Sequence, residues 1–315
     1  MPNNNSRRQD HFVAALEDTP IAPIDKLDES QKARSTWADA WDAMRRRPMF
    51  WIASSLILLI IVVVLFPTLF TQVSPTVCHL ADSNGSPTGG HPLGFTRQGC
   101  DVFSRVIHGA QASVTVGVVT MVLVTLFGGT IGALAGYYGG WLDAIVSRVG
   151  DIFFALPLVL GAIVLMQVLP ARTAVSVALV LALFAWPQIA RIMRGAVLSA
   201  RNTDYVTASI ALGVSKFKVL VRHVIPNSIA PVIVIATVSL GVYIVAEATL
   251  SFLGLGLPTN VMSWGNDISQ ARTSIKTSPQ VLLYPSAALS ITVLAFLMMG
   301  DVVRDALDPE SRARR

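Results

Sequence analysis

The side chains that most often carry out chemistry in proteins are few in this sequence and lie far apart. The five histidines lack the spacing of metal ligands; they are His11, His79, His91, His108 and His223. The sequence has no glycine-rich phosphate loop ending in Lys-Ser or Lys-Thr, and no Gly-x-Ser-x-Gly nucleophile turn. We therefore predict that the chain is not an enzyme, that it has no catalytic residue, and that it binds no metal or other cofactor itself.

One carboxylate lies inside a long apolar segment. Glu247 is followed and preceded by apolar residues, and a charge in such a place is costly. It either pairs with a neighbouring helix, lines a pathway or gate, or sits at a water-exposed helix end. Asp151, Arg191 and Asp301 fall at the edges of the apolar segments.

The composition indicates a membrane protein. Only 14% of the 315 residues are charged, whereas about 25% is usual in a soluble domain. Hydrophobic residues make up 53%, and the mean hydropathy is +0.59. These values argue against an ordinary soluble enzyme, a disordered chain and a nucleic-acid-binding protein, although the net charge is +5.

Six apolar segments have about the 20 residues that a helix needs to cross a bilayer. We therefore predict an all-α integral membrane protein with six transmembrane helices. The first segment follows a long polar stretch and lacks a cleavage site, so we expect it to stay as an anchor. The segments are 49–71, 113–137, 151–170, 172–191, 229–253 and 281–299.

Lysine and arginine are concentrated in alternate connections. Arg45 to Arg47 precede the first segment, and the connection between the fourth and fifth carries five basic residues. Since basic loops stay in the cytoplasm, both termini are predicted to be cytoplasmic. We divide the chain into a disordered cytoplasmic tail (1–30), an interfacial amphipathic helix (31–48), a transmembrane permease domain (49–309) and a cytoplasmic tail (310–315).

The prediction of a helix at 31–48 depends on Trp37, Trp41 and Met44, which recur at helical spacing. An ordinary polar segment leading into the first span is the alternative. The predicted external loop 72–112 contains both cysteines, Cys78 and Cys100. That compartment allows a disulfide between them, and two unrelated thiols are the alternative.

Several small or helix-breaking residues fall within the segments. Pro157 and Pro187 each remove a backbone donor and are expected to kink their helices. Glycine recurs at 128, 132, 136 and 140, which predicts a face for close helix packing. Trp264 is expected either at the membrane interface or at an outer gate.

The connection 199–227 predicts a hairpin of two short helices on the cytoplasmic face. Asn202 or Thr203 can cap the first helix, Gly213 can end it in a left-handed turn, and Ser215 can cap the second. The hairpin has more apolar residues than a solvated loop needs, which suggests that it binds in a groove of a partner protein. Packing of the hairpin on its own helix bundle is the alternative.

This hairpin resembles the cytoplasmic coupling motif of ABC importer permeases, whose pattern is Glu-Ala-Ala, three residues, Gly, and later Ile-x-Leu-Pro. Thr207, Ala208 and Ser209 occupy the first three places, and Gly213 occupies the glycine. The segment 224–227 (VIPN) resembles the closing element. Thr207 replaces the usual glutamate, so no specific glutamate contact carries over.

Further segments resemble dipeptide and oligopeptide permeases, most closely the C-type subunit (the OppC/DppC group). The stretches 91–94 (HPLG) and 99–105 (GCDVFSR) resemble the external entry to the second span. The stretches 246–254 (AEATLSFLG) and 300–309 match the ends of the fifth and sixth spans. The resemblance covers residues 35 to 309.

The resemblance implies the type I permease fold of ABC importers in a bacterial cytoplasmic membrane. It implies a subunit that moves dipeptides or oligopeptides inward by alternating access. Its partners would be a second, B-type permease, two ATPase subunits that bind ATP and Mg, and an external substrate-binding protein. The ATPase-coupling residues implied are Tyr205, Thr207, Ala208, Ser209, Gly213, Ser215, Lys216 and Leu220.

Three other functions stay open on the sequence. An ABC importer of nickel or haem would share almost every feature used here. A self-contained secondary transporter would need a complete pathway and an ion site. A receptor or scaffold would need no pathway.

Overall fold

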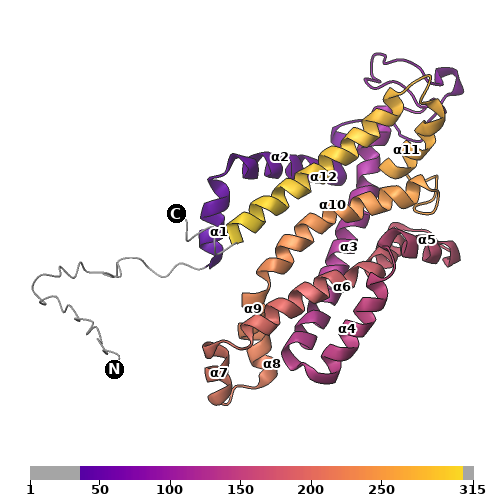
Figure 1. Ribbon diagram of the computed structural model, residues 1–315. Helices are drawn as coiled ribbons and strands as arrows, with labels where there is room; N and C mark the ends of the chain where they lie inside the picture. Colours follow the sequence, from indigo (N-terminus) through magenta and orange to yellow (C-terminus); the bar gives the residue numbers. More distant parts are fainter. Residues whose placement is uncertain (1–35, 308–315) are drawn as a thin grey trace, which may run out of the picture.

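The computed structural model describes residues 36–307, and within them the regular structure is helical (Figure 1). This confirms the predicted all-α class. The tails predicted at 1–30 and 310–315, and residues 31–35, lie outside the described residues. The helices are α1 (Thr36–Arg45), α2 (Pro48–Leu65), α3 (Val102–Tyr138), α4 (Gly140–Phe154), α5 (Leu158–Val168), α6 (Ala174–Ala200), α7 (Asp204–Ala211), α8 (Lys216–Val219), α9 (Ile225–Ser228), α10 (Ala230–Phe252), α11 (Trp264–Ala271) and α12 (Gln280–Leu307).

Within the described part, five helices are long and apolar enough to cross a membrane: α2, α3, α6, α10 and α12. The third predicted span, 151–170, is not one straight helix. It runs from the last turn of α4 into α5, and these two helices meet at an angle of 85°. Pro157 lies at this break. Because a proline cannot donate a backbone hydrogen bond and disfavours helical geometry in the residue before it, it interrupts the helix. Pro187, in contrast, lies inside α6, which continues past it.

Two spans begin before the predicted positions. The helix predicted at 113 starts at Val102, where the Asp101 side chain accepts a hydrogen bond of 2.7 Å from the Ser104 backbone N–H. The loop predicted at 72–112 therefore ends at 101. Likewise α4 begins at Gly140, eleven residues before the predicted start at Asp151. Apolarity alone gave the wrong starts because charged residues interrupt the early turns of both helices, Arg105 in α3 and Asp143 and Arg148 in α4.

Glycine allows α3 and α6 to approach closely. A Cβ atom at Gly128 or Gly136 would lie 2.6 or 2.8 Å from a carbonyl oxygen of α6, and one at Gly132 would lie closer still to that of Ala190. Three of the four predicted packing glycines therefore face α6. Gly140 does not: with φ of +61° it belongs to the turn between α3 and α4, where a Cβ would have open space.

The loop before α3 forms a compact cap at one end of the bundle, here called the loop end. A disulfide joins Cys78 to Cys100. The Ser104 hydroxyl donates to the Val73 carbonyl at 2.5 Å, and that of Ser278 to the Asn84 carbonyl at 3.5 Å. These contacts attach the loop to α3 and to the segment before α12.

At its other end, α12 packs against α1 and α2 (Figure 1). Arg47 forms an ion pair with Asp305 near the end of α12. In α1, Ala40 is buried, whereas Trp37 and Trp41 are about half exposed. The helix thus has one face on the bundle and an aromatic face directed outward.

A valine at Gly132 should weaken the bundle. Its side chain would overlap the Ala190 backbone, and overpacking of this kind typically costs about 1–3 kcal/mol. The measurement is the midpoint of thermal unfolding in detergent. Gly129→Val is the matched control, since a Cβ at Gly129 meets nothing within 4 Å. Equal stability of the two variants would contradict the close α3–α6 contact.

Candidate functional site

The hairpin between α6 and α10 turns at Gly213. Its φ of +83° confirms the predicted left-handed turn. The Gly213 N–H donates to the Ile210 carbonyl at 2.9 Å, and the Val214 N–H to the Ser209 carbonyl at 3.2 Å. This pair of bonds is a Schellman motif, which satisfies the last carbonyls of α7.

The helix starts of the hairpin fall where the sequence predicts them, but their side chains do not cap them. Thr203 and Ser215 are the N-cap residues of α7 and α8, and neither side chain makes a cap hydrogen bond. The Thr203 hydroxyl instead donates to the Ala200 carbonyl at 2.7 Å, at the end of α6. After α8 the chain continues through a π-helical turn (Leu220–Val224) into α9.

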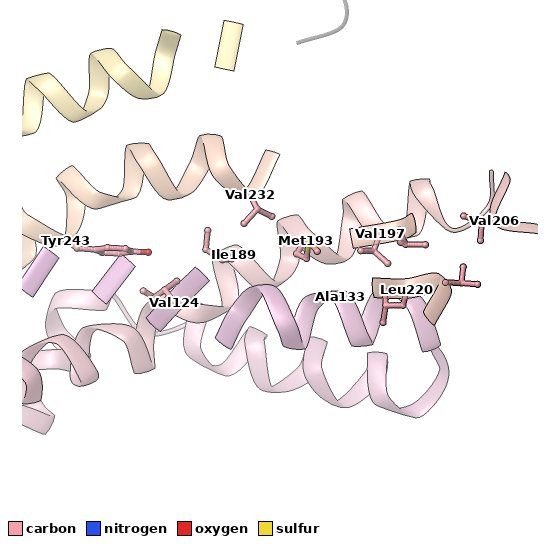
Figure 2. Close-up of a cluster of buried hydrophobic side chains, with 12 residues drawn as sticks. Val124, Ala133, Ile189, Met193, Val197, Val206, Leu220, Val232 and Tyr243 are labelled. Atoms are coloured by element: carbon pink, nitrogen blue, oxygen red, sulfur yellow. The ribbon is translucent and has the colours of Figure 1, made fainter. Parts of the chain in front are cut away.

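One face of the hairpin is built into the core of the bundle. Val206 of α7 and Leu220 of the π turn are each 1% exposed. Figure 2 shows them in line with Val197 and Met193 of α6 and with Ala133 of α3. Leu220, grouped above with the ATPase-coupling residues, is therefore an anchor whose side chain reaches no surface of this chain.

The opposite face of the hairpin is exposed and apolar. Leu212 is 84% and Phe217 is 64% exposed, and Tyr205 and Ile210 also lie on the surface. Three basic residues of the same hairpin are also exposed: Lys216, Lys218 and Arg222. Of the other predicted coupling residues, Thr207, Ala208, Gly213 and Ser215 are exposed, and Ser209 is half-buried. The hairpin thus combines the two alternatives of the sequence analysis: it packs on its own bundle and it presents an apolar face with a basic rim.

A cluster of buried polar side chains lies at the loop end, between α3, α10 and α11. Glu247 is fully buried, and the Ser251 hydroxyl donates to its Oε1 at 2.7 Å. The hydroxyls of Ser113 and Ser263 also lie beside this carboxyl. Glu247 therefore lies among neighbouring helices and is not at a water-exposed helix end.

Trp264 is buried in the same region, with 3% of its surface exposed. Its Nε1–H donates to the Val106 carbonyl at 2.9 Å, and its backbone N–H to the Ser113 hydroxyl at 3.2 Å. Its side chain thus packs against α3 and does not lie at the surface, as a residue at the membrane interface would.

An ion pair that the sequence analysis missed joins α3 to α11. The Arg105 Nε–H donates to Asp267 Oδ1 at 2.8 Å, and both side chains are about nine-tenths buried. Burial raises the pKa of the Asp267 carboxyl, and the adjacent Arg105 guanidinium acts in the opposite direction. The residues are 162 positions apart, so no local pattern could have revealed the pair.

Two more ion pairs join α4 to α6. Arg194 contacts both carboxylate oxygens of Asp143, and Arg191 contacts Asp151 at 3.1 Å. Asp151 lies in the last turn of α4, and Arg191 lies nine residues before the end of α6. No cluster of three or more His, Cys, Asp or Glu residues suited to a metal is found among residues 36–307.

Two family models match the chain. One describes the inner membrane component of binding-protein-dependent transport systems and matches residues 128–313. The other describes the N-terminal transmembrane domain of oligopeptide transport permease C and matches residues 35–87. Together they cover the first helices, the end of α3, the helices from α4 to α12 and the hairpin, and residues 88–127 lie between the two matches.

Similar proteins cover nearly the whole chain. The dipeptide transport permease DppC of Alkalihalophilus pseudofirmus is 32% identical over 306 residues, 97% of this chain and 100% of the relative. The oligopeptide permease OppC of Bacillus subtilis is 35% identical over 90% of this chain and 92% of its own. The glutathione transport permease GsiD of Pectobacterium atrosepticum is 32% identical over 90% and 94%.

Replacing Arg105 by leucine should destabilise the loop end strongly. The change leaves the buried Asp267 carboxylate without its cation, and breaking a buried pair in this way typically costs about 3–5 kcal/mol. The double variant Arg105→Leu/Asp267→Leu removes both charges and should recover most of the loss. Thermal unfolding in detergent measures both. A single variant as stable as the parent chain would contradict the buried pair.

Proposed function

This chain belongs to the C-type permeases of ABC peptide importers, and we propose that it moves short peptides, dipeptides or oligopeptides, into the cytoplasm at the expense of ATP. As a permease subunit with the type I fold of its family, it is a multi-pass protein of the bacterial inner membrane and is not itself an enzyme. The relatives named above transport dipeptides, oligopeptides and glutathione, which are all short peptides. Their names favour a peptide cargo over nickel or haem.

The two-faced hairpin carries the proposal for coupling. Two ATPase subunits bind ATP and Mg, and one of them grips the exposed face around Leu212 and Phe217. A large exposed apolar surface with a polar rim is typical of a protein-binding site. Tyr205, Thr207 and Lys216 of the same hairpin are also exposed and are the further contact residues of this proposal.

The buried face of the hairpin transmits the movement. Because Val206 and Leu220 pack against Val197 and Ala133, the hairpin cannot shift without moving α3 and α6. Packed cores move as rigid bodies. ATP binding closes the ATPases, draws together the hairpins of the two permeases and opens the pathway outward.

The remaining partners complete the importer. A homologous B-type permease supplies the other half of the pathway, and an external binding protein delivers the peptide. In this arrangement both termini and the hairpin are cytoplasmic, and the disulfide-closed loop 72–101 is outside, where a disulfide is stable. Glu247 and Trp264 hold the loop end of the pathway together from within the bundle.

Serines in place of Leu212 and Phe217 should abolish ATPase binding. The change removes the two most exposed large apolar side chains of the hairpin without touching its buried face. The measurement is recovery of the ATPase subunits with the tagged permease in mild detergent, with mass spectrometry of the complex. Leu220→Ala is the control: it should keep the ATPases bound but lower peptide uptake per ATP hydrolysed. Full recovery with the double serine variant would contradict the docking face.

A valine at Gly213 should uncouple transport without blocking membrane insertion. The left-handed φ costs a side-chain-bearing residue roughly 1–2 kcal/mol, and a β-branched side chain suffers most. Since a Cβ there has open space, the effect comes from the backbone alone. Gly213→Asn, which tolerates this φ, should retain most peptide uptake. Uptake by Gly213→Val equal to that of the parent chain would show that the turn is not needed.

A further inference from the structure

An ion pair joins α4 to α6 at the edges of two predicted spans, 151–170 and 172–191. Asp151 follows the start of α4 by eleven residues, and Arg191 precedes the end of α6 by nine. At 1.5 Å per residue, both lie about 14–16 Å from the hairpin-side ends of these helices. Because these two distances along the helices are similar, the residues lie at the same level of the bundle, as the 3.1 Å contact between their side chains requires.

This pair is open to its surroundings. The Asp151 and Arg191 side chains are 56% and 59% exposed and share one contact, from Arg191 Nη2 to Asp151 Oδ1. The neighbouring pair Arg194–Asp143 differs, since it is more buried and uses both carboxylate oxygens. Charges in or beside a membrane span rarely face lipid, because their desolvation is expensive, and usually face a partner or a water-filled cavity.

A cavity lies beside the pair. It opens between α4 and α6, which run side by side in Figure 1, and has a volume of about 200 Å³. Gly150, Asp151, Phe154, Pro187 and Arg191 contribute to its wall. The Arg191 guanidinium lies 4.0 Å from the centre of the Phe154 ring, so an aromatic surface adjoins the charges.

From this placement we infer that Asp151 and Arg191 form a transit site for the charged ends of a peptide. Asp151 receives the ammonium group and Arg191 the carboxylate. The inference rests on the proposed peptide cargo and adds to it a place in this chain where the cargo binds.

The chemistry of the cargo matches that of the site. A free peptide carries an ammonium and a carboxylate at neutral pH, and moving either charge out of water is costly. An acid and a base side by side offer each end an opposite charge. Arginine suits the carboxylate, since its planar fork donates two parallel hydrogen bonds. The single exposed contact between Arg191 and Asp151 is weak enough to be exchanged for the peptide.

The test uses the complete importer in proteoliposomes, with its partner permease, ATPases and binding protein. The variant Asp151→Asn/Arg191→Gln removes both charges, so it leaves no unpaired charge that could disturb folding. We expect normal assembly and ATP hydrolysis, and dipeptide uptake per assembled complex lowered about tenfold or more, as for the loss of charge-assisted hydrogen bonds to the cargo. The matched control Arg47→Gln/Asp305→Asn removes another exposed ion pair, which lies outside the cavity, and should keep uptake per assembled complex.

A second measurement locates the peptide directly. A peptide carrying a benzophenone side chain, irradiated during turnover, should attach to residues of α4 or α6 that line the cavity, and the double variant should lose these adducts. Unchanged uptake by the double variant, or adducts confined to other segments, would overturn the inference.

A loss of uptake that depends on phosphatidylglycerol in the vesicles, without peptide adducts at the cavity, would assign the pair to a lipid headgroup instead. A wild-type complex that assembles but takes up no peptide would refute the proposed function itself, whereas normal wild-type uptake with an unaffected double variant refutes only the transit site.

Discussion

The contact between α3 and α6 positions most of the other parts of this molecule. Inside a membrane, apolar helices gain little from avoiding lipid, so they associate where their backbones can come close. Gly128, Gly132 and Gly136 provide such a surface on α3, since a Cβ at each would run into the α6 backbone. After α3 the chain reverses through Gly139 and Gly140, both with positive φ, and α4 returns alongside α6. The ion pairs between α4 and α6 follow from that return.

The same helix α6 also fixes the hairpin. Its final turns supply Met193 and Val197 to the cluster that holds Val206 and Leu220, so the hairpin continues the core of the bundle and does not hang from it as a loop (Figure 2). A partner that binds the exposed face therefore acts on α3 and α6 together. The π-helical turn at Leu220–Val224 lets the chain bend into α9 while Leu220 and Val224 stay buried.

The two ends of the bundle use different interactions. At the hairpin end, apolar side chains fill the contact between the hairpin and the long helices. At the loop end, buried polar groups add to an apolar cluster: Glu247 with its surrounding serines, and Arg105 with Asp267. Buried polar groups need partners in fixed geometry, so this end is specified by hydrogen bonds from three helices. Between the ends, the pair Asp151–Arg191 is exposed, unlike the buried apolar and polar groups at the two ends, and it lines the cavity between α4 and α6.

The sequence alone determined the class of the fold, five of the six spans, the left-handed turn at Gly213 and the family, because each depends on a local run, one special backbone position or a motif. Span starts were less accurate, since charged residues interrupt the early turns of α3 and α4 and shorten their apolar runs. Only the tertiary structure decided that Leu220 and Trp264 are buried, that Arg105 meets Asp267, and that Asp151 meets Arg191 within the bundle. These contacts join residues that are 40 or more positions apart, or depend on which face of a helix meets its neighbour. Such pairings follow from the way the helices pack, and neither hydropathy nor spacing along the chain contains that information.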